Sequence, residues 1–140
     1  MAIINVYLTF DGNCEEAFNF YKSVFGGEFE FMGRFADMPS EAGGDTIPED
    51  EKNRVMHVSL PISNETRLMG SDTGGEWATN FKEGNNFSIS VSAGSKEEAD
   101  RLFSELSADG EVTMAMGDTF WGSYFGSLTD RFGVNWMIQA

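Results

Sequence analysis

Basic residues, cysteines and long apolar runs are scarce in this chain of 140 residues, and each scarcity excludes a class of protein. The chain has 9 Lys and Arg but 23 Asp and Glu, which gives a net charge of −14. That field repels a phosphate backbone, so we expect no nucleic-acid partner. The single cysteine, Cys14, excludes an intramolecular disulfide framework. No apolar run is long enough to cross a bilayer and the N-terminus lacks the pattern of a secretory signal, so we expect a cytoplasmic protein without membrane contact.

The residues that are present fit a packed globular protein. Hydrophobic residues make up 41% of the chain and aromatic residues 14%, which argues against disorder. At this length we expect a single domain that spans residues 1–140. Six acidic residues and no basic one lie between Asp37 and Glu51. We interpret this acidic segment as a solvated loop.

One supersecondary unit occurs twice along the chain. Residues 13–17, Asn-Cys-Glu-Glu-Ala, return as Ser-Lys-Glu-Glu-Ala at 95–99, and each copy follows a segment that alternates apolar and polar residues. Such alternation predicts a strand with one apolar face. Asn13 and Ser95 have the spacing to Glu that is typical of a helix N-cap, and glycines at 26 and 110 suit the helix ends.

Each copy continues with three further strands, so the order of elements is βαβββ in both. We therefore predict an α+β fold with two tandem βαβββ modules, at residues 1–72 and 85–140, within one domain. Each module forms a curved mixed sheet with its helix on the outer face, because the helix buries its apolar stripe on the sheet. The polar strand residues then point the other way, into a concavity that suits a small molecule.

Several motifs carry a family resemblance over nearly the whole chain. Phe20-Tyr21 and Val24-Phe25-Gly26 near the end of the first helix, and the turn Asp130-Arg131-Phe132-Gly133, are similar to those of the glyoxalase/bleomycin-resistance/dioxygenase (vicinal oxygen chelate) superfamily. The segments 7–13, 56–60, 118–122 and 132–136 resemble the PhnB-like branch more closely. The resemblance implies the doubled βαβββ fold and a homodimer, with pockets between the modules of one chain or across the dimer.

The metal site of that superfamily maps onto unsuitable residues here. The resemblance places its ligands, usually His or Gln on first strands and Glu on last strands, at or beside Asn5, Met69, Ser88 and Met137. Thioethers, a hydroxyl and an amide are poor ligands for zinc, nickel, iron or manganese. We expect no metal and no cofactor. Part of the branch also carries the label of a ubiquinone-biosynthesis methyltransferase, yet no glycine-rich turn for a nucleotide-type cofactor follows a strand.

The only histidine, His57, is predicted to point into the concavity. Its imidazole can act as a general base or hold a ligand, with Glu30 or Tyr7 assisting; the alternative is a structural histidine bonded to a neighbouring strand. Glu30 and Arg34 either flank it or form an ordinary cross-strand ion pair. The predicted ligand-binding residues, which combine the inward-facing positions with an aromatic cluster next to Gly122, are Ser59, Arg34, Met69, Ser88, Trp121, Tyr124, Phe125 and Met137.

Three other reactive side chains receive structural interpretations. Cys14 lies in the first turn of a helix, where the dipole lowers a thiol pKa, but we expect a buried or inert thiol because no second cysteine is near in the sequence. Asp72 and Asp118 end strands or loops, and we interpret each as a turn-former.

Three functions are compatible with these patterns. The first is a metal-independent small-molecule binder, similar to the drug-sequestering members of the superfamily, whose acidic character favours cationic or neutral ligands. The second is a PhnB-like enzyme of the lyase, isomerase or dioxygenase type that uses His57 as base or a displaced metal site. The third is a structural or interaction module whose pocket is filled by side chains. The sequence leaves open whether the protein is an enzyme.

Overall fold

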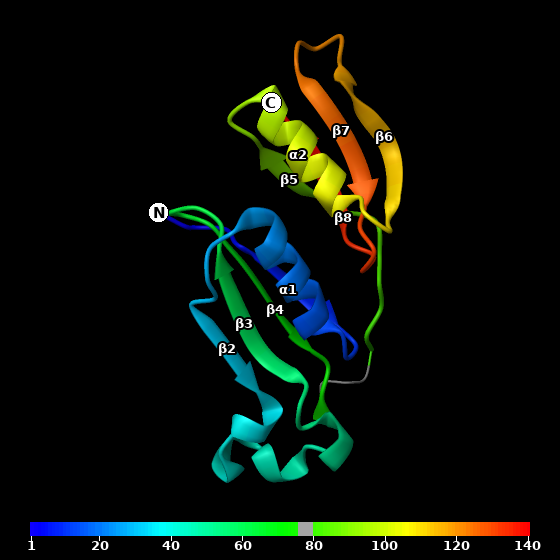
Figure 1. The fold of residues 1–140 in the computed structure, drawn as a ribbon. Helices are drawn as coiled ribbons and strands as arrows, with labels where there is room; N and C mark the ends of the chain where they lie inside the picture. The colour runs from blue at the N-terminus through cyan, green and yellow to red at the C-terminus, as the bar shows by residue number, and fades with distance from the viewer. Residues whose placement is uncertain (76–79) are drawn as a thin grey trace. The chain divides into compact units, whose positions relative to one another are not determined.

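The computed structural model describes residues 1–75 and 80–140, which form two compact units. The units comprise Met1–Lys82 and Glu83–Ala140, and we call them the first and second modules. The predicted modules 1–72 and 85–140 lie within them. Figure 1 shows one helix beside one sheet in each module. That the two modules make a single domain stays a prediction.

The first module has the predicted order βαβββ and a four-stranded mixed sheet. Its strands lie in the order β1-β4-β3-β2, with β1 parallel to β4 and the other neighbours antiparallel. Its elements are β1 (Val6–Phe10), α1 (Cys14–Phe25), β2 (Phe31–Arg34), β3 (Val55–Pro61) and β4 (Arg67–Asp72).

Helix α1 covers one face of this sheet because its apolar residues recur at helical spacing. Ala17, Phe18, Tyr21 and Val24 are all buried, and the helix packs against β3 and β4. Close approach requires Gly70 on β4, where an added Cβ would lie 2.7 Å from a ring carbon of Phe18. We call the opposite face of each sheet its inner face.

The second module repeats the order and the topology. Its strands lie in the order β5-β8-β7-β6, again with one parallel pair, β5 and β8. Helix α2 packs against β7 and β8 and buries three apolar residues, Ala99, Leu102 and Leu106. The elements are β5 (Ile89–Ser92), α2 (Lys96–Leu106), β6 (Glu111–Asp118), β7 (Tyr124–Thr129) and β8 (Asn135–Gln139).

Helix ends follow the prediction at one site and differ at the other. Gly26 directly follows α1 with φ +80°, as predicted. Helix α2 instead ends at Leu106, and the left-handed residue that follows is Asp109, with φ +59°. Gly110 serves a different purpose, since an added Cβ would lie 2.3 Å from the Thr129 carbonyl oxygen.

The acidic segment is a folded structure and not merely a solvated loop. Together with Phe35 and Ala36, which precede it and are counted as part of it from here on, it forms four short 3-10 turns, Phe35–Asp37, Ser40–Ala42, Gly44–Thr46 and Glu49–Glu51. Its acidic side chains are mostly exposed, but Phe35 and Ile47 are only 4% and 5% exposed. These buried apolar residues fix the acidic segment against the rest of the first module.

The two modules confirm the predicted α+β class with tandem βαβββ units. Register confirms the predicted faces for β1, β3 and β4 but corrects β2: Phe31 lies opposite Ser59, and Gly33 lies opposite His57. Met32 therefore lies opposite Val58, on the helix side. No helix in the described ranges has the length and apolar character needed to cross a membrane.

Candidate functional site

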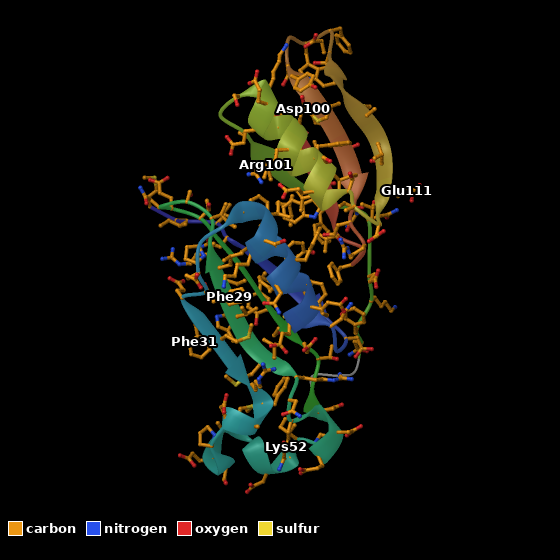
Figure 2. The ribbon with its side chains drawn as sticks, viewed as in Figure 1. Phe29, Phe31, Lys52, Asp100, Arg101 and Glu111 are labelled. Atoms are coloured by element: carbon orange, nitrogen blue, oxygen red, sulfur yellow. The ribbon has the colours of Figure 1, made fainter. Side chains whose placement is uncertain are left out.

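A row of four side chains crosses the inner face of the first sheet. Strand register places Tyr7 beside Met69, Met69 beside Ser59, and Ser59 beside Phe31. Phe31 projects from β2 at the edge of the sheet (Figure 2). Tyr7 and Phe31 remain 49% and 48% exposed, whereas Ser59 is only 3% exposed. This face therefore presents two rings and a thioether to a ligand, with the Ser59 hydroxyl buried beneath them.

His57 lies between the two rings of this row. Its Nδ1 is 3.3 Å from the Tyr7 hydroxyl, and the two rings stack at a centroid distance of 5.7 Å. The Phe31 ring lies 5.6 Å away on a tilted plane. No contact of Nε2 occurs among the described residues. When Nδ1–H donates to Tyr7, Nε2 carries a lone pair and can accept a proton or a hydrogen bond.

Glu30 and Arg67 form an ion pair at the end of the same face. The Glu30 carboxylate accepts hydrogen bonds from Nε of Arg67 and, at 2.7 Å, from the Ser59 hydroxyl. The bond from Arg67 first, and that from Ser59 second, lower the pKa of Glu30. Glu30 therefore stays ionised at neutral pH and contacts Ser59 rather than His57, so the structure does not place it as a partner of the imidazole.

A cavity of about 500 Å³ opens beside this row, between the sheet and the acidic segment. Tyr7 lines it together with Thr9 and Ser71, which supply hydroxyl groups. Apolar walls come from Phe35 and Met38 of the acidic segment and from Met56. A cavity of this size, mostly apolar with a few convergent polar groups, is typical of a small-molecule site.

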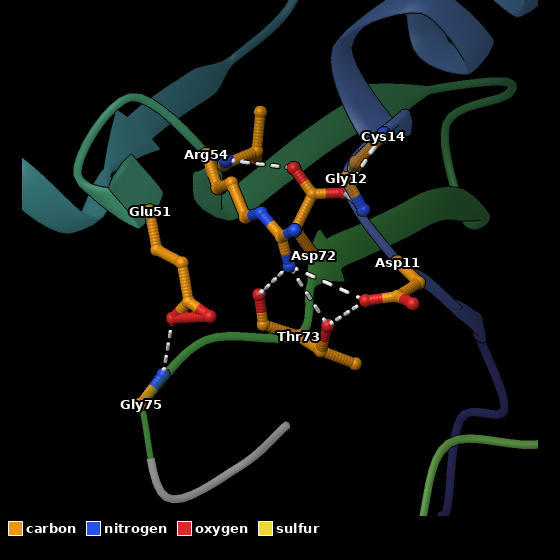
Figure 3. A network of polar contacts seen from close by, with 9 residues as sticks. Asp11, Gly12, Cys14, Glu51, Arg54, Asp72, Thr73 and Gly75 are labelled. Atoms are coloured by element: carbon orange, nitrogen blue, oxygen red, sulfur yellow. Dashed lines mark hydrogen bonds and ion pairs between the residues drawn. The ribbon is translucent and has the colours of Figure 1, made fainter. Parts of the chain in front are cut away.

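Asp72 closes the far end of the cavity and also holds the fold. Its carboxylate is 4% exposed and accepts hydrogen bonds from the backbone N–H groups of Gly12, Cys14 and Val55, each at 2.9 Å. Figure 3 shows these bonds beside the Arg54 guanidinium. The negative charge lies at the N-terminus of α1, where the helix dipole favours it. Asp72 is thus more than the predicted turn-former, since it joins β4 to β3 and α1.

Cys14 is buried, as predicted. Burial first, then the charge of Asp72, raises the pKa of its thiol. A thiol kept protonated is a poor nucleophile.

Two predicted ligand-binding residues lie on the helix side of their sheets. The Arg34 guanidinium pairs with Glu15 of α1, at 2.6 Å, and donates to the Asn53 carbonyl. It neither pairs with Glu30 nor flanks His57. The Tyr124 hydroxyl donates to Asp100 of α2 at 2.6 Å. In both cases a carboxylate on the helix attracts the polar group at the end of a long side chain.

The inner face of the second sheet carries a different set of groups. Register aligns Ser90 with Met137 and Met137 with Ser127, while Ser88 precedes β5 and is exposed. Phe125 contacts the Trp121 ring at 5.8 Å, edge to face. The second module therefore keeps predicted residues Ser88, Trp121, Phe125 and Met137 available but has neither imidazole nor charge among them.

The residues at the family's metal positions do not fit a divalent ion. Register pairs Met69 with Tyr7 and Met137 with Ser90, which are thioethers beside hydroxyls. Within residues 1–75 and 80–140, no three His, Cys, Asp or Glu side chains gather in a geometry that would hold a metal. We therefore derive no chemical step through a metal.

A nucleotide-type cofactor finds no phosphate-binding helix start either. The N–H groups at the start of α1 already donate to Asp72, and the Ser95 hydroxyl accepts from Glu98 N at the start of α2. At the start of each helix, one backbone N–H that a phosphate could use already donates to a side chain of the same module.

Sequence reasoning missed Arg67, Phe31 and two walls of the cavity, Phe35 and Met38. Arg67 shares the strand parity of Met69, which was the available signal for it. The apolar residues Phe35, Met38 and Ile47 within an otherwise acidic stretch were the signal that this stretch folds inward.

The fold is that of the glyoxalase/bleomycin-resistance/dioxygenase superfamily, with a sheet face and an adjoining cavity as the candidate site. Residues 2–139 match the family described as 3-demethylubiquinone-9 3-methyltransferase, and the chain belongs to that family. The description names the family, and the geometry above adds no support for a methyl-transfer step.

Related proteins cover almost the whole chain. Protein YjdN of Escherichia coli is 31% identical over 98% of this chain and 94% of its own. The crystal structure of protein PA1353 from Pseudomonas aeruginosa is 41% identical, covers 99% and 96% of the two chains, and has a TM-score of 0.83. The putative 3-demethylubiquinone-9 3-methyltransferase, PhnB protein, from Bacillus cereus is 29% identical over 96% of each chain, with a TM-score of 0.74. These similarities confirm the PhnB-like branch.

The fold is also that of the wider superfamily. A glyoxalase/bleomycin resistance protein/dioxygenase family enzyme from Burkholderia phytofirmans is 16% identical over 98% of this chain and 94% of its own, with a TM-score of 0.58. At that identity the likeness concerns the fold alone.

Proposed function

We propose that the first module binds a small organic molecule on the inner face of its sheet and that binding needs no metal. The observation that carries the proposal is the cavity of about 500 Å³ that Tyr7 shares with the row containing His57. Rings and thioethers supply apolar contact, and hydroxyls supply orientation. An open cavity of this size counts against a module whose pocket is filled by its own side chains.

The neutral fluorescent probe N-phenyl-1-naphthylamine tests this proposal. We expect its emission to rise on binding and the rise to be the same in excess EDTA. Ser71→Leu places an isobutyl group in the cavity. We expect it to weaken probe binding about tenfold or more, because the new side chain occupies the space that an aromatic ring of the probe needs. Ser127→Leu, the matched change on the inner face of the second module, is the control.

The outcomes separate cleanly. Binding that disappears in EDTA contradicts the metal-independent part of the proposal. Equal loss in Ser71→Leu and Ser127→Leu, or no loss in either, contradicts the assignment of the site to the first module.

A second candidate function is proton transfer by His57. The contact between Nδ1 and the Tyr7 hydroxyl favours it, because this contact orients the ring and leaves Nε2 without a hydrogen bond among the described residues. Exchange of carbon-bound hydrogen in D₂O, followed by NMR for a panel of 2-oxo acids, tests it. We expect exchange with the wild type and none with His57→Ala; equal exchange in the two proteins overturns it.

The homodimer and the cytoplasmic location implied above belong to the same proposal. Exposed apolar residues such as Val112 and Met114 on β6, 48% and 50% exposed, are compatible with a subunit contact. Sedimentation equilibrium at several protein concentrations gives the mass directly. A monomer at every concentration contradicts the dimer without affecting the first-module site.

A further inference from the structure

Arg67 is the one lysine or arginine on the inner face of the described strands of the first module. It leaves β4 with the parity of Met69, and its Nε donates to Glu30. Within the described chain, its two Nη groups make no hydrogen bond, and the side chain is 39% exposed. The guanidinium therefore has donors to spare on the face where the proposed ligand lies.

The ion pair with Glu30 orients this guanidinium but uses only one of its nitrogen atoms. Glu30 itself is held by the Ser59 hydroxyl at 2.7 Å, so Nε has a fixed anchor. A guanidinium has five donors in a rigid fork, and the pair of Nη groups remains free for a second, bidentate acceptor. A side chain held in place before binding loses less entropy when a ligand arrives.

The charges along β4 are arranged in opposite senses at its two ends. Asp72 and the acidic segment lie at the cavity end, and Arg67 lies four residues before Ser71, roughly 13 Å away at the usual rise of a strand. The net charge of −14 is screened beyond about 8 Å at physiological salt, so local groups decide what each end accepts. The cavity end suits an uncharged group, and the Arg67 end suits an anion.

We propose that the ligand is an amphipathic carboxylic acid, whose apolar end fills the cavity and whose carboxylate binds the Nη groups of Arg67. This inference rests on the proposed function and names the class of molecule that the site takes. Between the two ends, the ligand lies along the Tyr7 and Met69 row, next to the imidazole of His57. This proposal, based on the groups that line the site, replaces the expectation of a cationic or neutral ligand that was based on the net charge of the chain.

Three compounds of nearly equal size test the inference: 6-phenylhexanoate, 6-phenylhexanamide and 6-phenylhexylamine. Each competes with N-phenyl-1-naphthylamine for the wild-type chain. We expect the acid to bind about tenfold more tightly than the amide, because a bidentate contact between two charged groups is stronger than one to a neutral group. We expect the amine to be the weakest of the three.

Arg67→Gln then removes the anchor and keeps most of the side chain. We expect the acid to lose its advantage over the amide in this variant, while the affinity for the amide stays within about twofold, since only the charged contact is lost. Arg67→Lys, which keeps the charge without the fork, is expected to lie between the two. Arg101→Gln, on helix α2 of the second module, is the control, and the melting temperature of each variant verifies folding.

Each alternative result has a distinct meaning. Equal affinity for the three compounds, or an acid preference that survives Arg67→Gln, overturns the carboxylate inference while the cavity function stands. A preference for the amine also overturns the carboxylate inference, and it supports the expectation of a cationic ligand that the net charge gave. If Ser71→Leu leaves the affinity for N-phenyl-1-naphthylamine unchanged, the proposed function itself is contradicted.

Discussion

The two modules share an order of elements, yet each starts its helix in a different way. In the second module, Ser95 lies next to the helix in sequence and its hydroxyl accepts from Glu98 N at 3.1 Å. In the first module, the N-cap position Asn13 makes no side-chain bond. A carboxylate from the end of β4, Asp72, accepts from Gly12 and Cys14 instead. Local capping makes a module independent of distant groups, whereas the Asp72 bonds make the helix, β3 and β4 of the first module cooperative.

The inner faces of the two sheets also carry different side chains. The inner face of the first module carries the imidazole of His57, the two exposed rings beside it, and the ion pair of Glu30 and Arg67. The acidic segment adds a wall of the cavity. The second module presents hydroxyls and Met137 in a row without charge. A duplicated unit has therefore kept its framework in both copies while only one copy gathers titratable groups at the site.

The largest expected effect separates the two ways of capping. Asp72→Ala leaves two buried N–H groups, those of Cys14 and Val55, and the partly buried N–H of Gly12 without their acceptor. We expect the free energy of unfolding to fall by about 3 kcal/mol. Ser95→Ala removes one local cap and should cost about 1 kcal/mol. Urea unfolding of both variants measures the difference. Equal losses would contradict the greater cooperativity of the first module.

A glycine in each sheet gives the next effect. At Gly70 an added Cβ would lie 2.7 Å from the Leu8 carbonyl oxygen and from the Phe18 ring, whereas at Gly117 on β6 it would meet nothing within 4 Å. We expect Gly70→Ala to destabilise the protein by roughly 1–3 kcal/mol through overpacking. Gly117→Ala is expected to change stability by less than about 0.5 kcal/mol, as at other open surface sites. Thermal melts of both variants provide the comparison, and a harmless Gly70→Ala would refute the close packing of α1 on β4.

The thiol of Cys14 reports on the first module alone. Because burial raises its pKa and excludes solvent, we expect a disulfide reagent such as dithiobis(nitrobenzoate) to react at least about a hundredfold more slowly with the native chain than with the chain in urea. Asp72→Ala should speed the native reaction, since the first turn of α1 opens. Rapid labelling of native wild type would show that this helix start is not protected.

The smallest effects are on the pH dependence of stability, and they have opposite signs in the two modules. Because the pKa of Glu30 is lowered in the folded state, this residue stabilises the fold at pH values above its unfolded pKa, near 4.5. This stabilisation is lost as the pH falls through the folded pKa. The bond to Asp100 raises the pKa of the Tyr124 hydroxyl, so its contribution is present below the unfolded value, near 10, and lost as pH rises. Both groups are exposed, so we expect small changes.

Two variants isolate these effects. Glu30→Gln should flatten the acidic side of a plot of melting temperature against pH, and Tyr124→Phe the alkaline side. The measurement is a series of melts between pH 3 and pH 11. A change on the opposite side for either variant would contradict the assigned bonds.

Much of the first-module site followed from strand periodicity, and its exceptions have local causes. Alternation placed Tyr7, Met69, Ser59 and His57 correctly because β1, β3 and β4 are long enough to show it. Strand β2 has only four residues, too few for alternation to decide which face points inward, and a register shift separates Gly33 from Arg34. The prediction for Arg34 was therefore wrong. Tyr124 was grouped with its aromatic neighbours, but one step along a strand reverses the face, and Asp100 holds it on the helix side.

The sequence by itself determined the doubled βαβββ order, the helix stripes and the family, because these depend on periodicity and on residues close together in the chain. Only the tertiary structure decided that Asp72 caps a helix from a distant strand, that the acidic segment walls a cavity, and that Arg67 is held by Glu30 on the face of His57. Those arrangements depend on register and on side-chain direction, and contacts between residues far apart in the chain set both.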